Sequence, residues 1–308
     1  KLKTSISQSE LDENGLIERT GEQPIIKIGE GWFINIKDHL PQIRTMIDQI
    51  DWQPIKHKRR IEDWCDQIQW DWSISRDRNF GIPIPGEENM TFDTWFISSL
   101  SPQLAWSSSI GRSELNCPIF DLRFQSHDII RTWAFYTIAM SYYLNNQIPW
   151  KTIMITGHTL DGGGNKFSKS SGNATNPAPL INEFGIEGIR YWASCNTLGT
   201  DTQLDKEKMK MGWKLLNKLK NAEKFINMQI ENGWIGTDIE YLNIWNLTRE
   251  QIYMHLEAYE IDKAIALLYK FFWNEFCDIW IEKSKQTPTS TTLNLIIKDI
   301  KEIFEIFI

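Results

Sequence analysis

Residues 120–157 read FDLRFQSHDIIRTWAFYTIAMSYYLNNQIPWKTIMITG, and their pattern predicts a strand, a helix and a second strand. FDLRFQ is a short strand, residues 127–144 have the apolar spacing of a helix, and residues 151–157 are rich in β-branched residues. A helical crossover of this kind joins parallel strands. The sequence therefore predicts an α/β domain with a parallel sheet. Ligands bind at the carboxyl edge of such sheets.

The segments on either side of this unit have different patterns. Residues 1 to about 60 predict irregular, β-rich structure, with strands in QPIIKIGEGWFINI around Gly29–Gly31. After about residue 200 the pattern is helical, and no clear strand follows Asp201. Thr248 with Gln251 predicts a capping box that opens one helix. The next helix repeats apolar residues at helical spacing, namely Ile265, Leu268, Phe272, Phe276 and Ile279.

The composition limits the class of protein. The 308 residues include 15 tryptophans, which indicates large buried cores in two or three domains. No apolar run reaches about 18 residues and the first 30 residues are polar, so neither a membrane helix nor a signal peptide is expected. The four cysteines form no CxxC pair, which argues against a zinc ribbon or a disulfide framework and fits the reducing cytosol.

Two basic segments stand out in a chain whose net charge is −7. One is KHKRR, residues 56–60, and the other holds seven lysines between residues 206 and 224. Four of these lysines recur every four residues and form one stripe on a helix: Lys206, Lys210, Lys214 and Lys218. The stripe is either a surface for RNA phosphates or an ordinary solvated helix face.

The loop HTLDGGGNKFSKSSGN, residues 158–173, follows the second predicted strand. Its glycines allow movement, and its lysines and serines could hold phosphate groups. It is not a P-loop, because G-x-x-x-x-G-K-[ST] is absent. Two interpretations remain, a mobile phosphate clamp and a polar surface hairpin. A clamp should be among the most mobile segments of the chain when no anion is bound.

Residues 166–170, KFSKS, resemble the Lys-Met-Ser-Lys-Ser signature of class I aminoacyl-tRNA synthetases. Collinear blocks between about Trp32 and about Ile300 are similar to valyl-tRNA synthetases in their archaeal-like form. They include ITGHTLD, FGIEGIRYWAS, FDTWFISSLSPQ, HDIIRTWAFYT and IEDWCDQIQWDWSISRDRNFGIPIP. The resemblance implies a cytoplasmic enzyme that activates valine with ATP and Mg²⁺ and transfers it to tRNA. Its fold would be α/β, the second half of a Rossmann-like parallel sheet, followed by an all-α helical bundle.

The resemblance also implies roles for individual residues. Lys166 and Lys169 would be the catalytic charges on the departing pyrophosphate, and Ser168 and Ser170 would hold the ATP phosphates. Ser126, His127 and Asp128 match positions beside the adenosine, although Ser126 stands where the family usually has glycine. Four residues match blocks that flank the amino-acid pocket, or are core aromatics and a helix cap: Trp70, Trp72, Asp93 and Trp95. The lysine stripe would contact tRNA. No zinc or other metal site is expected, because GIPIPGEENMTFDTW is shorter than the family norm.

The resemblance predicts three segments. Residues 1–60 would be the returning end of the editing insertion, residues 61–200 the second Rossmann half, and residues 201–308 part of the anticodon-binding bundle. No His-Ile-Gly-His-type tetrapeptide occurs in the sequence. We therefore expect a C-terminal portion of a synthetase, inactive alone and complemented by an N-terminal half. The alternatives are a non-catalytic tRNA-binding or regulatory paralogue, and a paralogue that activates an amino acid outside translation.

Overall fold

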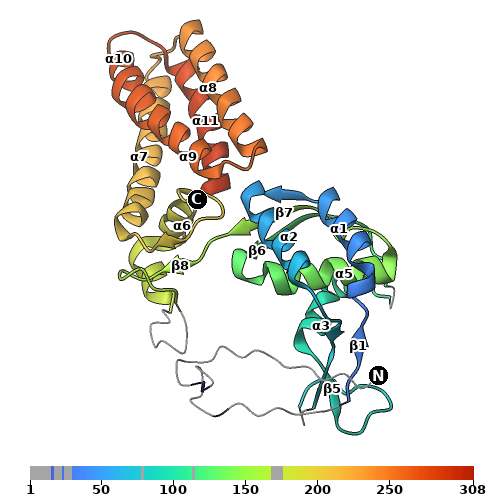
Figure 1. Ribbon diagram of the computed structural model, residues 1–308. Coiled ribbons are helices and arrows are strands. Elements are labelled where there is room, and N and C mark those ends of the chain that lie inside the picture. The colour runs from blue at the N-terminus through green and yellow to red at the C-terminus, as the bar shows by residue number, and fades with distance from the viewer. Residues whose placement is uncertain (1–14, 17–22, 24–29, 78–79, 113–114, 168–175) are drawn as a thin grey trace. The chain divides into compact units, whose positions relative to one another are not determined.

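The computed structural model describes residues 15–16, 23, 30–77, 80–112, 115–167 and 176–308. The chain forms two compact units, Lys1–Ile153 and Met154–Ile308 (Figure 1). The first unit contains β1 (Phe33–Ile34), η1 (Lys37–His39), α1 (Leu40–Gln49), β2 (Asp51–Gln53), η2 (Ile55–His57), α2 (Lys58–Gln67), β3 (Trp72–Ser73), β4 (Ser75–Asp77), β5 (Met90–Phe92), α3 (Thr94–Ser99), α4 (Ser101–Ile110), β6 (Phe120–Ser126), η3 (His127–Ile129), η4 (Ile130–Ala134) and α5 (Phe135–Asn145). The strand β7 (Trp150–Thr156) crosses the boundary between the units.

The predicted strand–helix–strand unit is confirmed. A three-stranded sheet has the order β2-β7-β6, and η3, η4 and α5 connect β6 to β7. The amide of Phe120, the first residue of β6, donates to the carbonyl of Pro149, which directly precedes β7 (3.1 Å). The two strands therefore start side by side and run in the same direction, as the helical crossover requires.

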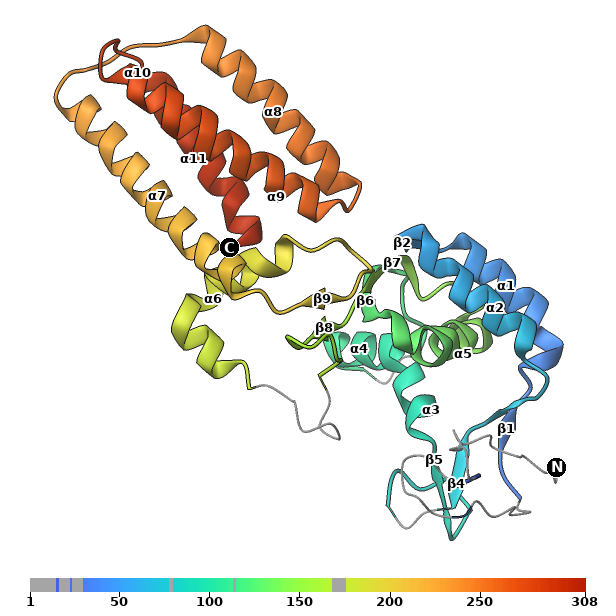
Figure 2. The same ribbon diagram turned by 60° about the vertical axis from the view of Figure 1, so that its left-hand side comes forward.

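The middle strand β7 supplies much of the apolar core of this sheet. Ile153, Met154 and Ile155 follow one another in sequence, and each is at most 2% exposed. Consecutive burial is expected for a parallel strand that is covered on both faces. The helices α1 and α5 pack together (Figure 2). The helix α2 packs against η4. Two smaller antiparallel pairs, β1 with β3 and β4 with β5, complete the strands described in this unit.

The prediction of β-rich structure before residue 60 is wrong for residues 37–60. This segment is mostly helical, with η1, α1, η2 and the start of α2, and its one described strand is the three-residue β2. Ile43, Met46 and Ile47 are buried at helical spacing on α1, and Pro41 stands in its first turn, where proline is tolerated. In QPIIKIGEGWFINI only the two residues of β1 form a strand among those that the structure describes.

The second unit is mostly helical, as predicted. It contains β8 (Thr159–Leu160), α6 (Ala178–Ser194), β9 (Thr202–Gln203), α7 (Lys206–Glu231), α8 (Ile239–Glu257), α9 (Ile261–Lys270), the π-helix η5 (Phe271–Ile281), α10 (Glu282–Ser284) and α11 (Ser290–Phe307). The helix α11 packs against both α7 and α8 (Figure 2). Contrary to expectation, one strand does follow Asp201, because the two residues of β9 pair in parallel with β8.

Two details of the predicted helices are wrong. The capping box at Thr248 does not exist, because α8 begins at Ile239 with Asp238 as its cap. The carboxylate of Asp238 accepts the amide of Tyr241 (3.1 Å), whereas the hydroxyl of Thr248 lies in mid-helix and donates to the carbonyl of Ile244 (2.9 Å). Ile279 is 39% exposed although the helical repeat placed it in the core, and Trp280 and Ile281 are buried instead. The π-helix has more residues per turn than an α-helix, so the buried positions shift.

The bundle core is aromatic. Trp245, Phe272, Phe276 and Phe304 are fully buried together with aliphatic residues of α7 and α11. The ring of Phe272 contacts those of Phe276 and Phe304 at centroid distances of 6.0 and 5.7 Å. Such contacts stabilise a core beyond the area that they bury. Across the described ranges, none of the helices has the length and apolarity that a membrane span requires.

Candidate functional site at the carboxyl edge of the sheet

Three residues predicted to face a nucleotide follow directly from β6. Ser126 is the last residue of the strand, and His127 and Asp128 open the 3-10 helix η3. Ser126 has extended backbone angles (φ −79°, ψ 158°), which any residue adopts, so its side chain causes no backbone strain. Ser126 and His127 are half-buried and Asp128 is exposed. All three therefore lie at the carboxyl end of a parallel strand.

His57, which the sequence did not single out, lies against His127. The two imidazole rings are stacked, with their centroids 5.8 Å apart and their planes inclined by 14°. Nη1 of Arg60 is 3.4 Å from Nδ1 of His127. His57 follows β2 and His127 follows β6, so the carboxyl ends of these two strands lie at the same edge of the sheet, on either side of β7. Part of the predicted basic segment KHKRR thus belongs to the sheet edge.

The cations of this segment have different surroundings. Lys58 pairs with Asp48 (2.6 Å), and this hydrogen bond is the main reason that the pKa of Lys58 is raised. Nε of Arg59 pairs with Asp63 (2.7 Å). In the part of the chain that the structure describes, neither Lys56 nor Arg60 has an acidic partner. Two of the four cations are therefore neutralised locally, and two are available to an anion.

One of the four predicted amino-acid pocket residues, Trp72, belongs to an aromatic cluster with Phe96 and Tyr136. The buried ring of Trp72 lies parallel to that of Tyr136, with centroids 3.8 Å apart and planes 4° apart. The buried carboxylate of Asp93 accepts the amide of Trp95 (3.0 Å) and pairs with Arg76 (2.8 Å). Asp93 is therefore both a helix cap and one half of an ion pair. Trp70, in contrast, is 66% exposed.

Tyr136 is a member of this cluster that the sequence did not indicate. Burial raises its pKa to about 12, with a further increase from the charge of Asp93 and a decrease from that of Arg76. Its hydroxyl therefore keeps its proton at ordinary pH and can donate a hydrogen bond. In the sequence it is one aromatic residue within a long apolar helix, and no local pattern distinguishes it from a core residue.

The first part of the lysine-bearing loop is an ordered hairpin in the second unit. Leu160 and Lys166 form an antiparallel bridge. One carboxylate oxygen of Asp161 accepts the backbone amides of Gly163 (2.9 Å) and Asn165 (2.8 Å). The side chain of Asp161 therefore holds the turn that presents Lys166. Ser168, Lys169 and Ser170 lie outside the described residues, and so does the second half of GGGNKFSKSSGN, the segment predicted to be mobile.

Gly157 lies before this hairpin, at a point where two backbone segments meet. A Cβ atom there would overlap the carbonyl oxygen of Thr200. The amide of the next residue, His158, donates to the carboxylate of Asp201 (2.7 Å), and its carbonyl accepts the amide of Thr202 (2.9 Å). Glycine is needed here for close approach rather than for an unusual φ angle.

The four stripe lysines lie on α7, but three of them have acidic partners. Lys206 pairs with Glu183, Lys210 with Glu207 and Lys218 with Asp278, at 3.2, 2.8 and 2.9 Å. The ammonium of Lys218 also lies 3.8 Å from the ring centroid of Trp273. Lys214 is exposed and has no acidic partner within the ranges that the structure describes. The stripe is therefore less electropositive than its sequence suggests.

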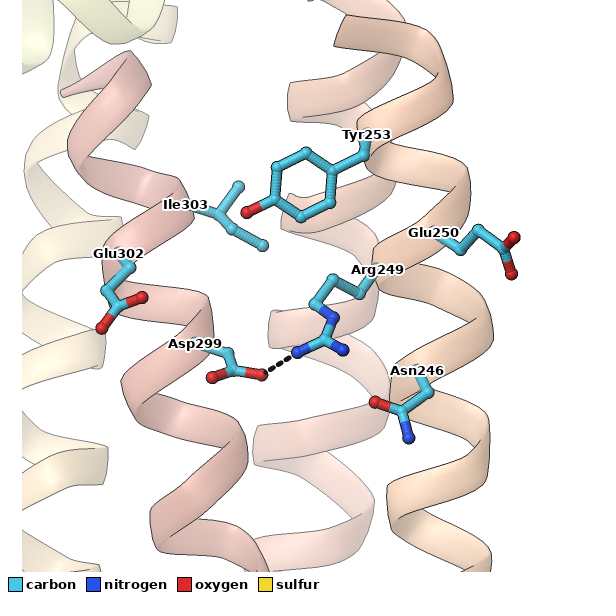
Figure 3. Close-up of a pocket in the computed structure, with 7 residues that line it drawn as sticks. All are labelled: Asn246, Arg249, Glu250, Tyr253, Asp299, Glu302 and Ile303. Atoms are coloured by element: carbon cyan, nitrogen blue, oxygen red, sulfur yellow. Dashed lines mark hydrogen bonds and ion pairs between the residues drawn. The ribbon is translucent and has the colours of Figure 1, made fainter. Parts of the chain in front are cut away.

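A pocket of about 540 Å³ lies between α8 and α11 (Figure 3). Seven residues line it: Asn246, Arg249, Glu250, Tyr253, Asp299, Glu302 and Ile303. Arg249 and Asp299 form an ion pair across it (2.6 Å), and Asp299 also accepts the indole N–H of Trp245 (2.9 Å). The lining residues include three carboxylates and one guanidinium, which disfavours phosphate. The main effect of these contacts is to tie α8 to α11.

The described residues contain no cluster of three or more histidine, cysteine or acidic side chains that could hold a metal ion. The sheet edge and the hairpin instead offer cations and N–H donors, which are suited to anionic ligands.

Comparison with protein families gives two matches. The family described as tRNA synthetases class I (I, L, M and V) matches residues 1–86 and 86–205. The family described as the anticodon-binding domain of tRNA ligase matches residues 238–308. Residues 206–237, which include α7, lie between the two matches.

Curated relatives include the valine–tRNA ligases of Anaplasma marginale (34% identical) and Ehrlichia ruminantium (36% identical). Each match covers 87% of this chain and 38% of the relative, so the chain spans about two fifths of the length of these relatives. Among solved structures, Mycobacterium tuberculosis methionyl-tRNA synthetase in complex with methionyl-adenylate superposes with a TM-score of 0.71. That match has 19% identity and covers 95% of this chain and 62% of the other, so it shows the shared fold alone.

Proposed function

The chain belongs to the class I tRNA synthetases, and from this premise we propose that it is a portion of a valine–tRNA ligase. The observation that carries the proposal is the 34–36% identity to valine–tRNA ligases over 87% of the chain. The reaction would join valine to ATP, release pyrophosphate and pass the valyl group to tRNA. Such chemistry needs positioning and charge stabilisation and no covalent enzyme intermediate.

We propose that this chain contributes residues that bind ATP with Mg²⁺. Ser126, His127 and Asp128 would contact the nucleoside portion, and their place at the carboxyl end of β6 supports this role. Lys166 and Lys169 would neutralise the charge that develops on pyrophosphate as it leaves, with Ser168 and Ser170 as further donors. The hydrogen bonds of Asp161, which hold the turn before Lys166, support a defined position for the first of these lysines.

Valine would be held by the aromatic cluster of the first unit. We propose that Trp72 and Trp95 supply apolar walls and that Asp93 fixes the start of α3. The exposure of Trp70 makes it the weakest member of the predicted set. The tRNA would contact the second unit through the lysine stripe of α7, and the match of residues 238–308 to an anticodon-binding family supports RNA binding by this unit.

We also propose the domain assignment that follows from this function. The segment before the sheet would be the returning end of an editing insertion, the sheet would be the second half of a Rossmann fold, and residues 201–308 would be part of an anticodon-binding bundle. Because β2 pairs in the sheet at residues 51–53, the Rossmann half would begin before residue 61.

Valine-dependent exchange of pyrophosphate into ATP tests this function. The 308 residues contain no His-Ile-Gly-His-type tetrapeptide, so we expect no exchange by this chain alone and recovery when a synthetase N-terminal half is added. Exchange above a protein-free control that Lys169→Ala abolishes would confirm the ligase and contradict the expected inactivity. Binding of tRNA with no recoverable exchange would favour the non-catalytic paralogue. Exchange driven by another amino acid but not by valine would favour activation outside translation.

A further inference from the structure

Arg60 is an exposed cation beside the nucleotide residues proposed above. Its neighbour Arg59 is also exposed but is paired with Asp63 (2.7 Å). Arg60 instead contacts the imidazole of His127 (Nη1 to Nδ1, 3.4 Å), and no carboxylate pairs with it in the described part of the chain. A guanidinium has five N–H donors, so most of its hydrogen-bonding capacity is left for a ligand or for water.

The contact fixes how His127 can act. A guanidinium only donates, so Nδ1 of His127 must accept, and the ring proton is therefore on Nε2. The stacked ring of His57, which is 5% exposed, holds the plane of His127. The edge of the sheet thus places an imidazole beside a guanidinium, and both kinds of group bind oxyanions in proteins.

We propose that Arg60, together with His127, binds a phosphate group of the nucleotide at the carboxyl edge of the β2-β7-β6 sheet. This inference rests on the proposed ATP site and adds to it a contact from α2, which the residues after β6 do not provide. The position favours a nucleotide over an RNA backbone. His57 lies in η2, after β2, and His127 opens η3, directly after β6, so their stacked rings lie near the carboxyl ends of two strands of the sheet, where small nucleotides bind in sheets of this kind.

Histidine NMR gives a direct test, because the chain has only five histidines. The 308-residue chain is labelled with ¹⁵N-histidine, and single His→Gln variants assign the five imidazole signals. ATP, inorganic tripolyphosphate and adenosine are then titrated separately into the chain. We expect tripolyphosphate, which has no nucleoside, to move the His127 and His57 signals as ATP does, and adenosine to move the His127 signal equally with or without Arg60.

The matched variants are Arg60→Gln and Arg59→Gln, which remove the same charge from adjacent positions. Loss of a charged hydrogen bond should raise the dissociation constant for ATP about tenfold in Arg60→Gln. Arg59→Gln should change it by less than about twofold, because Arg59 is already paired. Adenosine affinity should be the same in both variants.

The outcomes separate this inference from the proposed function. Equal effects of the two variants on ATP binding would overturn the role of Arg60 and leave the ATP site standing. An Arg60-dependent shift with tRNA but not with ATP would overturn the nucleotide assignment in favour of an RNA phosphate. If ATP binds nowhere on the chain while tRNA still binds, both the inference and the proposed ATP site fail.

Discussion

At Gly157 the chain tolerates no side chain, and this makes one residue decisive for the hairpin of the second unit. We expect Gly157→Ala to lower the free energy of unfolding by about 1–3 kcal/mol, because the backbone at Thr200 must move away from the added methyl group. Urea denaturation followed by circular dichroism measures the change.

The control for this prediction is Gly162→Ala in the same loop. A Cβ at Gly162 meets no atom within 4 Å, so this variant should be neutral or slightly stabilising. Equal midpoints for the two variants would show that the close approach at Gly157 is not a constraint in solution.

Tyr136 makes stability depend on alkaline pH. Its folded-state pKa is raised from 10.0 to about 12, so the folded protein keeps a proton that the unfolded chain loses between these values. This contribution to the free energy of unfolding is fully present below pH 10 and is lost as the pH rises toward 12. The loss is at most about 1.4 kcal/mol for each pH unit. Urea denaturation at pH 9 and pH 11 should show a smaller loss of stability in Tyr136→Phe than in the unmodified chain. Tyr253→Phe, at an exposed position, is the control and should behave like the unmodified chain.

At the scale of elements, α7 tests the RNA-binding interpretation of the lysine stripe. Lys214 has no acidic partner among the described residues, whereas Lys218 is paired with Asp278 and stacked on Trp273. If the stripe contacts phosphates, Lys214→Gln should flatten the log–log dependence of tRNA affinity on salt by about 0.7–0.9. Lys218→Gln should flatten it less. A slope that is unchanged even when all four lysines are glutamine would identify the stripe as a solvated helix face.

The elements also show what the sequence could predict and what it could not. The strand–helix–strand unit was predictable because each segment is long and has a clear period. Ile279 was misplaced because a π-helix has the same residues as an α-helix but a different period, which composition does not reveal. Thr248 was taken for a helix cap because Gln251 follows it at capping-box spacing, whereas the true cap, Asp238, is followed at that spacing by Tyr241. Helix α1 was missed because its short amphipathic run follows an irregular segment.

For the whole molecule, part of the candidate site follows from chain order and part does not. Ser126, His127 and Asp128 were predictable at a strand end because they come directly after β6. The stacking of His57 on His127 was not, because it depends on β2 being a neighbour of β7, a pairing between residues nearly 100 positions apart that no local pattern encodes. Tyr136 was missed for the same reason, since its partners Trp72 and Asp93 belong to distant segments.

The burial of β7 between β2 and β6 has a consequence for the rate at which its amide protons exchange with water. Amides in a central strand exchange only when the surrounding structure opens globally, so Ile153, Met154 and Ile155 should be among the slowest in the chain. A ligand that binds only the folded state slows such exchange by the factor by which it stabilises that state, about 100-fold at a hundred times its dissociation constant. The exchange rate of the β7 amides, followed over hours, would then report how much of the protein has a ligand at the sheet edge, and this measurement needs no catalytic turnover.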